Sequence, residues 1–132
     1  MAECEWAILC DYSFLDANRK TCIIGAFDKI CTPMVPAVLH QSSLAIKFLG
    51  QPNTSINFKM EAVRPTGAQL IRFEGTVQLG ETGTAEMQLN IAGLALPDFG
   101  PYAFNIYEGD ALLKTITFLV DKPPQAAAQA NQ

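Results

Sequence analysis

The amino-acid sequence predicts an all-β fold, an antiparallel two-sheet β-sandwich of about eight strands. Apolar and polar residues alternate at period two along most of the 132 residues, turns rich in Gly, Pro, Asn and Asp separate these runs, and no segment has helical periodicity. Such alternation is typical of antiparallel sheets with one solvated face. Because one sheet alone leaves its apolar face uncovered, two sheets should pack in an immunoglobulin-like or jelly-roll-like sandwich, with a closed β-barrel as the alternative.

The first two strands are predicted in residues 5–14 and 20–30. The first has one wholly apolar face, which consists of Trp6, Ile8, Cys10, Tyr12 and Phe14. A turn at residues 16–19 follows, because Asp and Asn tolerate turn geometry. The second strand is apolar on both faces and is therefore predicted to be central, with a bulge or close backbone approach at Gly25.

Residues 31–39 contain two prolines, which exclude a regular central strand and predict an apolar loop or crossover. Four further strands are predicted around residues 44–48, 54–63, 71–79 and 85–91, separated by turns with glycine or proline. The cleanest alternation is in residues 54–63, whose inward positions are Ile56, Phe58, Met60 and Ala62.

The clearest hairpin is predicted between residues 93 and 120. Apolar side chains alternate on both sides of a Gly109-Asp110 turn. Opposed residues on paired strands share a face, so a core position for both Phe104 and Ile116 requires a loop of odd length. The sequence therefore predicts the loop Gly109-Asp110-Ala111, with Glu108 opposite Leu112.

One domain is predicted in residues 1–121, followed by a Pro/Ala/Gln-rich tail in residues 122–132. The apolar fraction of 49% and the charged fraction of 17% are those of a globular protein. The net charge is −4, and no basic cluster exceeds Arg19-Lys20, so nucleic acid is not an expected partner. No run approaches the roughly 20 apolar residues of a membrane span.

A cytoplasmic location is expected, because acidic residues interrupt the N-terminal segment where a signal peptide would be apolar. The four cysteines, Cys4, Cys10, Cys22 and Cys31, are accordingly expected to be reduced. Three disulfide pairings remain open in an oxidising compartment. Zinc is the other alternative, although the chain lacks the short Cys-x₂₋₄-Cys spacing of structural zinc sites.

No catalytic motif, cofactor motif or metal site is recognised, so the protein is expected not to be an enzyme. His40 is the only histidine, and Ser42-Ser43 lie in a predicted strand without a Gly-x-Ser-x-Gly elbow. A cysteine paired with His40 is the remaining nucleophile hypothesis. Asp28 is interpreted either as a strand-end residue that bonds a neighbouring loop or as part of a binding site.

The candidate contact site is the loop Pro33-Met34-Val35-Pro36. On the surface, Met34 and Val35 would form an apolar patch of the kind that marks protein contacts. The alternative is that the loop closes one end of the sandwich. Trp6 and Tyr107 are candidates for stacking on a sugar.

Two segments resemble a family of small bacterial proteins of unknown function. They are Cys10-Asp11-Tyr12 with Gly25-Ala26-Phe27-Asp28-Lys29-Ile30, and the pattern Leu96-Pro97-x-x-Gly100-x-Tyr102-x-Phe104. The resemblance spans most of residues 8–120 and does not include the cysteines or the tail. It implies a cytoplasmic bacterial single domain without a known activity, and it supplies no catalytic residues.

The expected function is therefore non-enzymatic. The protein is expected to act through protein–protein contacts, with copies of itself in an oligomer or filament, or with another component. Sandwich edges pair with other chains unless they are blocked, and the first predicted strand carries no lysine to block it. A small-ligand or carbohydrate-binding module is the alternative.

Overall fold

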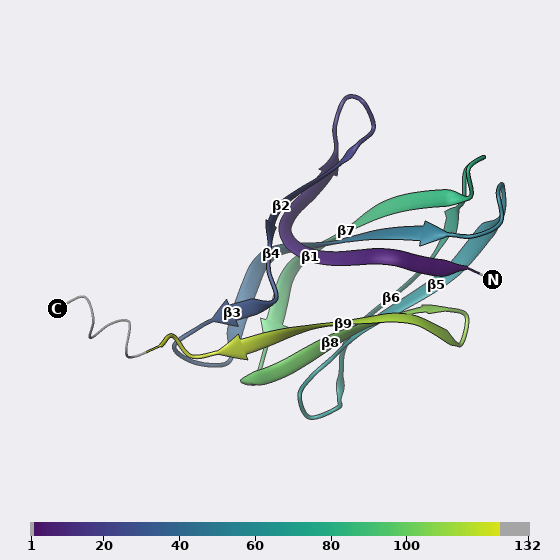
Figure 1. Cartoon of the computed structure of the whole chain (residues 1–132). Helices are drawn as coiled ribbons and strands as arrows, with labels where there is room; N and C mark the ends of the chain where they lie inside the picture. Colours follow the sequence, from purple (N-terminus) through teal and green to yellow (C-terminus); the bar gives the residue numbers. More distant parts are fainter. Residues whose placement is uncertain (1, 125–132) are drawn as a thin grey trace.

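The computed structural model describes residues 2–124 as nine strands in two packed sheets (Figure 1). One sheet has the order β2-β1-β4-β7 and the other has the order β3-β9-β8-β5-β6. The strands are β1 (Glu3–Leu15), β2 (Thr21–Ala26), β3 (Lys29–Cys31), β4 (Ala37–Leu49), β5 (Ser55–Val63), β6 (Gln69–Gln78), β7 (Thr84–Leu96), β8 (Gly100–Glu108) and β9 (Ala111–Asp121). The predicted two-sheet sandwich is confirmed, and neither sheet closes into a barrel. The part of the predicted tail in residues 125–132 lies outside the described residues.

The strand order is immunoglobulin-like. Strands β1, β4 and β7 occupy the positions of A, B and E, and strands β9, β8 and β5 occupy those of G, F and C in the facing sheet. The short strand β3 pairs in parallel with β9, whereas the other strand pairs are antiparallel. The chain thus leaves the first sheet after β2 and joins the second sheet at β3.

An aromatic stack forms the centre of the core. The rings of Tyr102 and Phe104 stack on Phe118 at centroid distances of 5.1 and 5.9 Å. From the other sheet, Phe48 contacts Phe58 at 6.2 Å. The inward positions predicted in residues 54–63 are confirmed, since all four of those side chains are buried.

The prediction of one central strand in residues 20–30 is wrong. This segment forms two edge strands, β2 and β3, separated by a bend at Phe27-Asp28. Gly25 has a φ of +71°, and a Cβ there would collide with the Asp11 carboxylate, so the expected close approach is confirmed.

The predicted apolar loop of residues 31–39 is shorter in the structure. Residues 32–36 form it, and β4 begins at Ala37. The strand predicted around residues 44–48 is therefore 13 residues long. Both prolines, Pro33 and Pro36, lie within the loop and outside the β4 ladder, which is why a longer strand is possible.

The loop of the last hairpin has two residues and not three. Glu108 pairs with Ala111 across Gly109-Asp110, so the predicted pair of Glu108 with Leu112 is wrong. The predicted core faces are nevertheless present, because Phe104 pairs with Ile116 and a register shift follows Ile106. This bulge inserts one residue into β9 and restores the parity that the short loop breaks.

Candidate functional site

The apolar face of the first strand turns away from the core. In β1 the side chain of Leu9 lies in the core and is 4% exposed, whereas Tyr12 and Phe14 are 50% and 45% exposed. A register shift between Cys4 and Trp6 sets this orientation, since each one-residue shift exchanges the two faces of a strand. The apolar face predicted for the first strand is therefore exposed to solvent at the C-terminal end of β1.

Four of the eight large apolar side chains that are exposed within residues 2–124 lie on the β1–β2 hairpin: Tyr12, Phe14, Leu15 and Ile24. Tyr12 pairs with Ile24, which is 52% exposed, and Phe14 pairs with the half-buried Cys22. Opposed residues of paired strands share a face, so these side chains lie together. We call Tyr12, Phe14 and Ile24 the hairpin patch.

The hairpin is fixed to the outer face of the four-stranded sheet. The hydroxyls of Ser13 and Ser43 are hydrogen-bonded in a buried position. Near the tip, Thr21 donates to Glu86, and the Gln88 side-chain amide donates to Thr21 at 3.3 Å. Because these bonds hold one side of the hairpin against β4 and β7, the patch on its other side is presented to solvent in a defined orientation.

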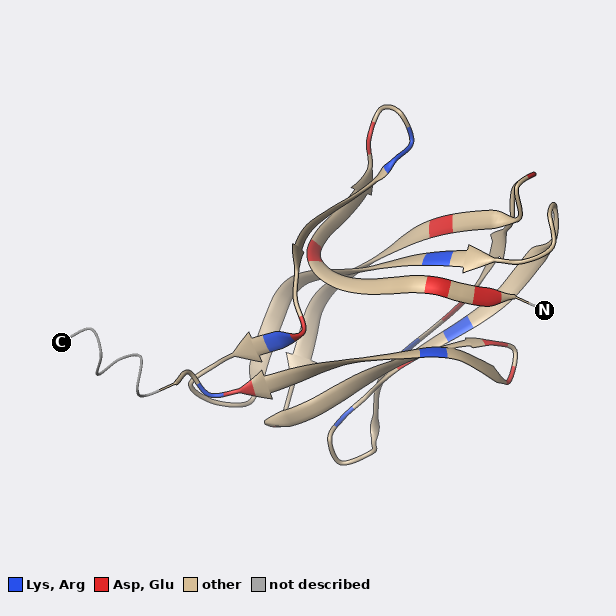
Figure 2. Cartoon of the chain, viewed as in Figure 1, with Lys and Arg blue, Asp and Glu red and all other residues tan. Residues whose placement is uncertain are grey.

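The hairpin projects from the sandwich and carries charge only at its base and its tip (Figures 1 and 2). Asp11 lies at the base, and Asp16, Arg19 and Lys20 lie around the turn. The Asp16 carboxylate accepts hydrogen bonds from the backbone amides of Asn18 and Lys20, which orders the turn as predicted. The two strands between these points carry no charged side chain.

In the predicted contact loop, Pro33-Met34-Val35-Pro36, one apolar side chain is exposed and another packs against the core. Met34 is 69% exposed, whereas Val35 packs against the hydrophobic core, and the Val35–Pro36 peptide bond is cis. The loop is anchored by the Thr32 amide, which donates to the Asp121 carbonyl at 2.9 Å. The loop thus closes one end of the sandwich with Val35 and leaves Met34, Pro33 and Pro36 exposed.

The four cysteines lie on β1, β2 and β3, and their thiols are free. Burial raises the pKa of Cys10, whose thiol donates to the carbonyl oxygens of Tyr12 at 3.2 Å and Ser43 at 3.5 Å. Burial also raises the pKa of Cys4. Both thiols are therefore poor nucleophiles, since the thiolate is the reactive form.

We expect four free thiols per chain in the native protein. Alkylation after denaturation without reductant, followed by mass spectrometry, should show four modified cysteines, because free thiols persist in a reducing compartment. A stoichiometric disulfide would contradict both the free thiols and a cytoplasmic location.

His40 and Asp28, the polar residues considered for a catalytic or binding site, lie on different elements of the structure. His40 is exposed on β4, and Asp28 is exposed in the bend between β2 and β3, where its carbonyl accepts a hydrogen bond from the Leu119 amide at 2.9 Å. This bond joins the bend to strand β9 through the backbone, so neither role considered for the Asp28 side chain is tested by it. Among residues 2–124, no three His, Cys, Asp or Glu side chains are grouped to hold a metal ion. No helical segment in that range has the length and hydropathy of a membrane span.

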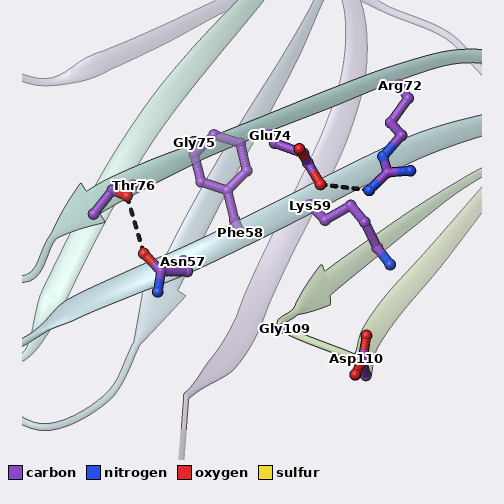
Figure 3. Close-up of a pocket in the computed structure, with 9 residues that line it drawn as sticks. All are labelled: Asn57, Phe58, Lys59, Arg72, Glu74, Gly75, Thr76, Gly109 and Asp110. Atoms are coloured by element: carbon purple, nitrogen blue, oxygen red, sulfur yellow. Dashed lines mark hydrogen bonds and ion pairs between the residues drawn. The ribbon is translucent and has the colours of Figure 1, made fainter.

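A polar cleft of about 480 Å³ lies on the outer face of the five-stranded sheet (Figure 3). Four of its polar side chains bond to one another: Arg72 pairs with Glu74, and Thr76 donates to Asn57 at 3.0 Å. The cleft also includes the end of the last hairpin. Its lining is Asn57, Phe58, Lys59, Arg72, Glu74, Gly75, Thr76, Gly109 and Asp110.

The two aromatic side chains considered for sugar stacking are both half-buried. The ammonium group of Lys59 lies 4.6 Å from the centre of the Tyr107 ring and covers one of its faces. The Tyr107 hydroxyl donates to Glu61 at 2.9 Å, and this hydrogen bond is the main reason that the pKa of Tyr107 is raised. The Tyr107 ring is thus engaged by neighbouring side chains.

The β7–β8 corner holds a buried polar arrangement that the sequence patterns did not reveal. The hydroxyl of the buried Tyr102 donates to the Asp98 carbonyl and accepts from the Asp98 amide, both at 2.9 Å. The Arg64 guanidinium donates two hydrogen bonds, of 2.8 and 3.2 Å, to the Asp98 carboxylate and thereby lowers the pKa of that carboxyl. A tyrosine bonded four residues upstream is the tyrosine corner of immunoglobulin-like sandwiches, which indicates a structural role.

Two solved structures are similar to the chain in fold. An alkylpurine DNA glycosylase from Pseudomonas fluorescens, solved with abasic DNA, aligns at a TM-score of 0.58 and 9% identity. The alignment covers 91% of this chain and 30% of the glycosylase, so the chain corresponds to less than a third of that protein. An immunoglobulin-like protein from Pseudomonas aeruginosa aligns at a TM-score of 0.46 and 13% identity, over 91% of this chain and 96% of that protein.

No curated protein is significantly similar in sequence. A family model matches residues 5–121, a range that includes all the strands except the first two residues of β1. The resemblance to a family of proteins of unknown function is therefore confirmed, and the chain belongs to the family of unknown function DUF6941.

Proposed function

We propose that the protein is a non-enzymatic β-sandwich that binds protein through the hairpin patch. The observation that carries this proposal is the position of Tyr12, Phe14 and Ile24. Each is about half exposed, all three lie on one face, and they belong to a hairpin that projects from the sandwich. Apolar residues clustered on one exposed face mark interaction sites, whereas single exposed ones are ordinary.

The way in which the hairpin is fixed supports binding by a rigid surface. Its other side is hydrogen-bonded to β4 and β7 through Ser13 and Thr21. A surface that is already ordered loses little conformational entropy when it binds. Tyrosine and phenylalanine contribute large contact areas, and aromatic residues are enriched in the cores of protein interfaces. Met34 lies on a separate loop and contributes a secondary contact at most.

The cleft of the five-stranded sheet supports a ligand-binding role less well. Four of its polar side chains are engaged with one another in the Arg72–Glu74 and Thr76–Asn57 pairs. A small ligand would have to replace these contacts, and ligand sites are mostly apolar with a few free polar groups. The net charge of −4 also argues against a nucleic-acid partner, so the DNA in the glycosylase structure is not carried over to this chain.

Site-specific photo-crosslinking in cells of the source organism tests the proposal. Benzoylphenylalanine replaces Phe14 in the patch or, as a control, Leu112 on β9, which is 56% exposed. We expect one discrete protein adduct from position 14, none from position 112, and loss of the adduct when Ile24→Lys is added. Equal adducts from both positions, or no adduct from position 14, would overturn the proposal.

A further inference from the structure

We propose that the partner at this surface is a second copy of the chain, which pairs in antiparallel orientation along the free edge of β2. This inference rests on the proposed function and gives it a partner. Within residues 2–124, β2 pairs with β1 on one side and with no strand on the other. Its outer backbone amides and carbonyls are therefore available for a new ladder.

The other three sheet edges carry protective features that β2 lacks. Strand β3 has only three residues and contains Lys29, which is paired with Asp121. Strand β6 contains the Arg72–Glu74 pair, and β7 contains Glu86. Charged side chains and short strands discourage edge pairing. Strand β2 has six residues, Thr21 to Ala26, and none of them is charged.

The sequence around β2 is complementary to itself in the antiparallel direction. When Ile24 is placed on the twofold axis, the axis relates Lys20, the residue just before β2, to Asp28 of the other copy, which lies in the bend just after β2. Both are exposed, and neither forms an ion pair within the part of the chain that the structure describes. A twofold axis repeats every contact, so two ion pairs flank the uncharged segment.

The side chains between these charges also fit this register. Ile24 meets Ile24 of the second copy, and Cys22 meets the small Ala26. These residues lie on the same face as the hairpin patch, so pairing joins the two patches into one apolar surface across four strands. The main-chain ladder supplies affinity, and the charges at its ends fix the register.

Light scattering after size-exclusion chromatography, with reductant present, tests the dimer at protein concentrations from about 5 to 200 µM. The monomer mass is 14.3 kDa, and we expect the mass to approach twice that value as the concentration rises. Ile24→Lys should abolish the dimer, because two lysines would face each other on the axis. Val38→Lys is the matched control, because Val38 on β4 is also 52% exposed, and it should leave the dimer intact.

Charge exchange tests the register. Lys20→Glu or Asp28→Lys alone should raise the dimer dissociation constant at least about tenfold, because each creates two like-charge contacts. The double exchange should restore wild-type dissociation, a result that a merely structural role of either residue does not produce. A monomer at all concentrations would overturn the dimer, as would a dimer insensitive to Ile24→Lys. If the position-14 adduct in cells then contains a different protein, the proposed function stands without this inference.

Discussion

Phe104→Ala is expected to reduce the free energy of unfolding by about 3–5 kcal/mol, the usual cost of truncating a core phenylalanine. The side chain is fully buried on β8 and its ring stacks on Phe118. The substitution removes buried apolar surface and leaves a cavity, since densely packed neighbours relax only in part. Urea denaturation followed by circular dichroism measures the loss as a lower midpoint with an unchanged slope.

The neighbouring residue provides the control. Asn105 points to the opposite face of β8, where it accepts from Thr115 at 2.7 Å and donates to Glu61 at 3.4 Å. Asn105→Ala should cost less than about 1 kcal/mol, because these bonds lie on the solvated side of the sheet. Equal losses from the two substitutions would show that the face assignment of β8 is wrong.

Period-two alternation was sufficient to predict the sandwich and much of its core. The inward residues of β5 and of the last hairpin follow directly from parity, because one face of each strand must be buried. The tight turn at Gly109-Asp110 was not predictable with the same rule. The bulge after Ile106 compensates for the short loop, and parity cannot distinguish that pair of features from a loop of odd length without a bulge.

Residues 20–30 show a different limit of sequence patterns. A strand that is apolar on both faces predicts a central position, yet this segment changes sheets, so that β2 contacts one sheet and β3 the other. Gly25 was recognised as a special position, but its consequence, the approach to Asp11, depends on a residue on another strand. Local sequence contains no information on which sheet a strand joins.

Two residues of the hairpin patch, Tyr12 and Phe14, belong to the wholly apolar face that the sequence predicts for the first strand. Its exposure was not predictable, because it depends on the register shift at Cys4–Trp6 and on the bonds of Ser13 and Thr21 to β4 and β7. The local composition of the loop Pro33-Met34-Val35-Pro36 favours it as a contact site instead. In the structure Val35 packs against the core, because the loop covers one end of the sandwich.

Gly83→Ala is the second substitution with a large expected effect, about 3–4 kcal/mol of lost stability. Gly83 lies in the turn between β6 and β7 with a φ of +76°, a conformation that costs any L-residue about 1–2 kcal/mol. A Cβ at this position would also collide with the Gly50 carbonyl oxygen. That second cost arises because the Gly50 amide donates to the Gly83 carbonyl at 2.9 Å, which holds the adjacent β4–β5 and β6–β7 turns together at one end of the sandwich.

Gly93→Ala separates the cost of the positive φ from the cost of the collision with the Gly50 carbonyl. Gly93 on β7 has a similar φ of +70°, but nothing lies within 4 Å of the position that its Cβ would occupy. Its replacement should therefore cost only the conformational part, about 1–2 kcal/mol. Urea denaturation of both variants measures the difference, which belongs to the contact between the β4–β5 and β6–β7 turns. If Gly83→Ala were no more destabilising than Gly93→Ala, the two turns would have to move apart freely, and the Gly50–Gly83 hydrogen bond would contribute nothing to the stability of that end of the sandwich.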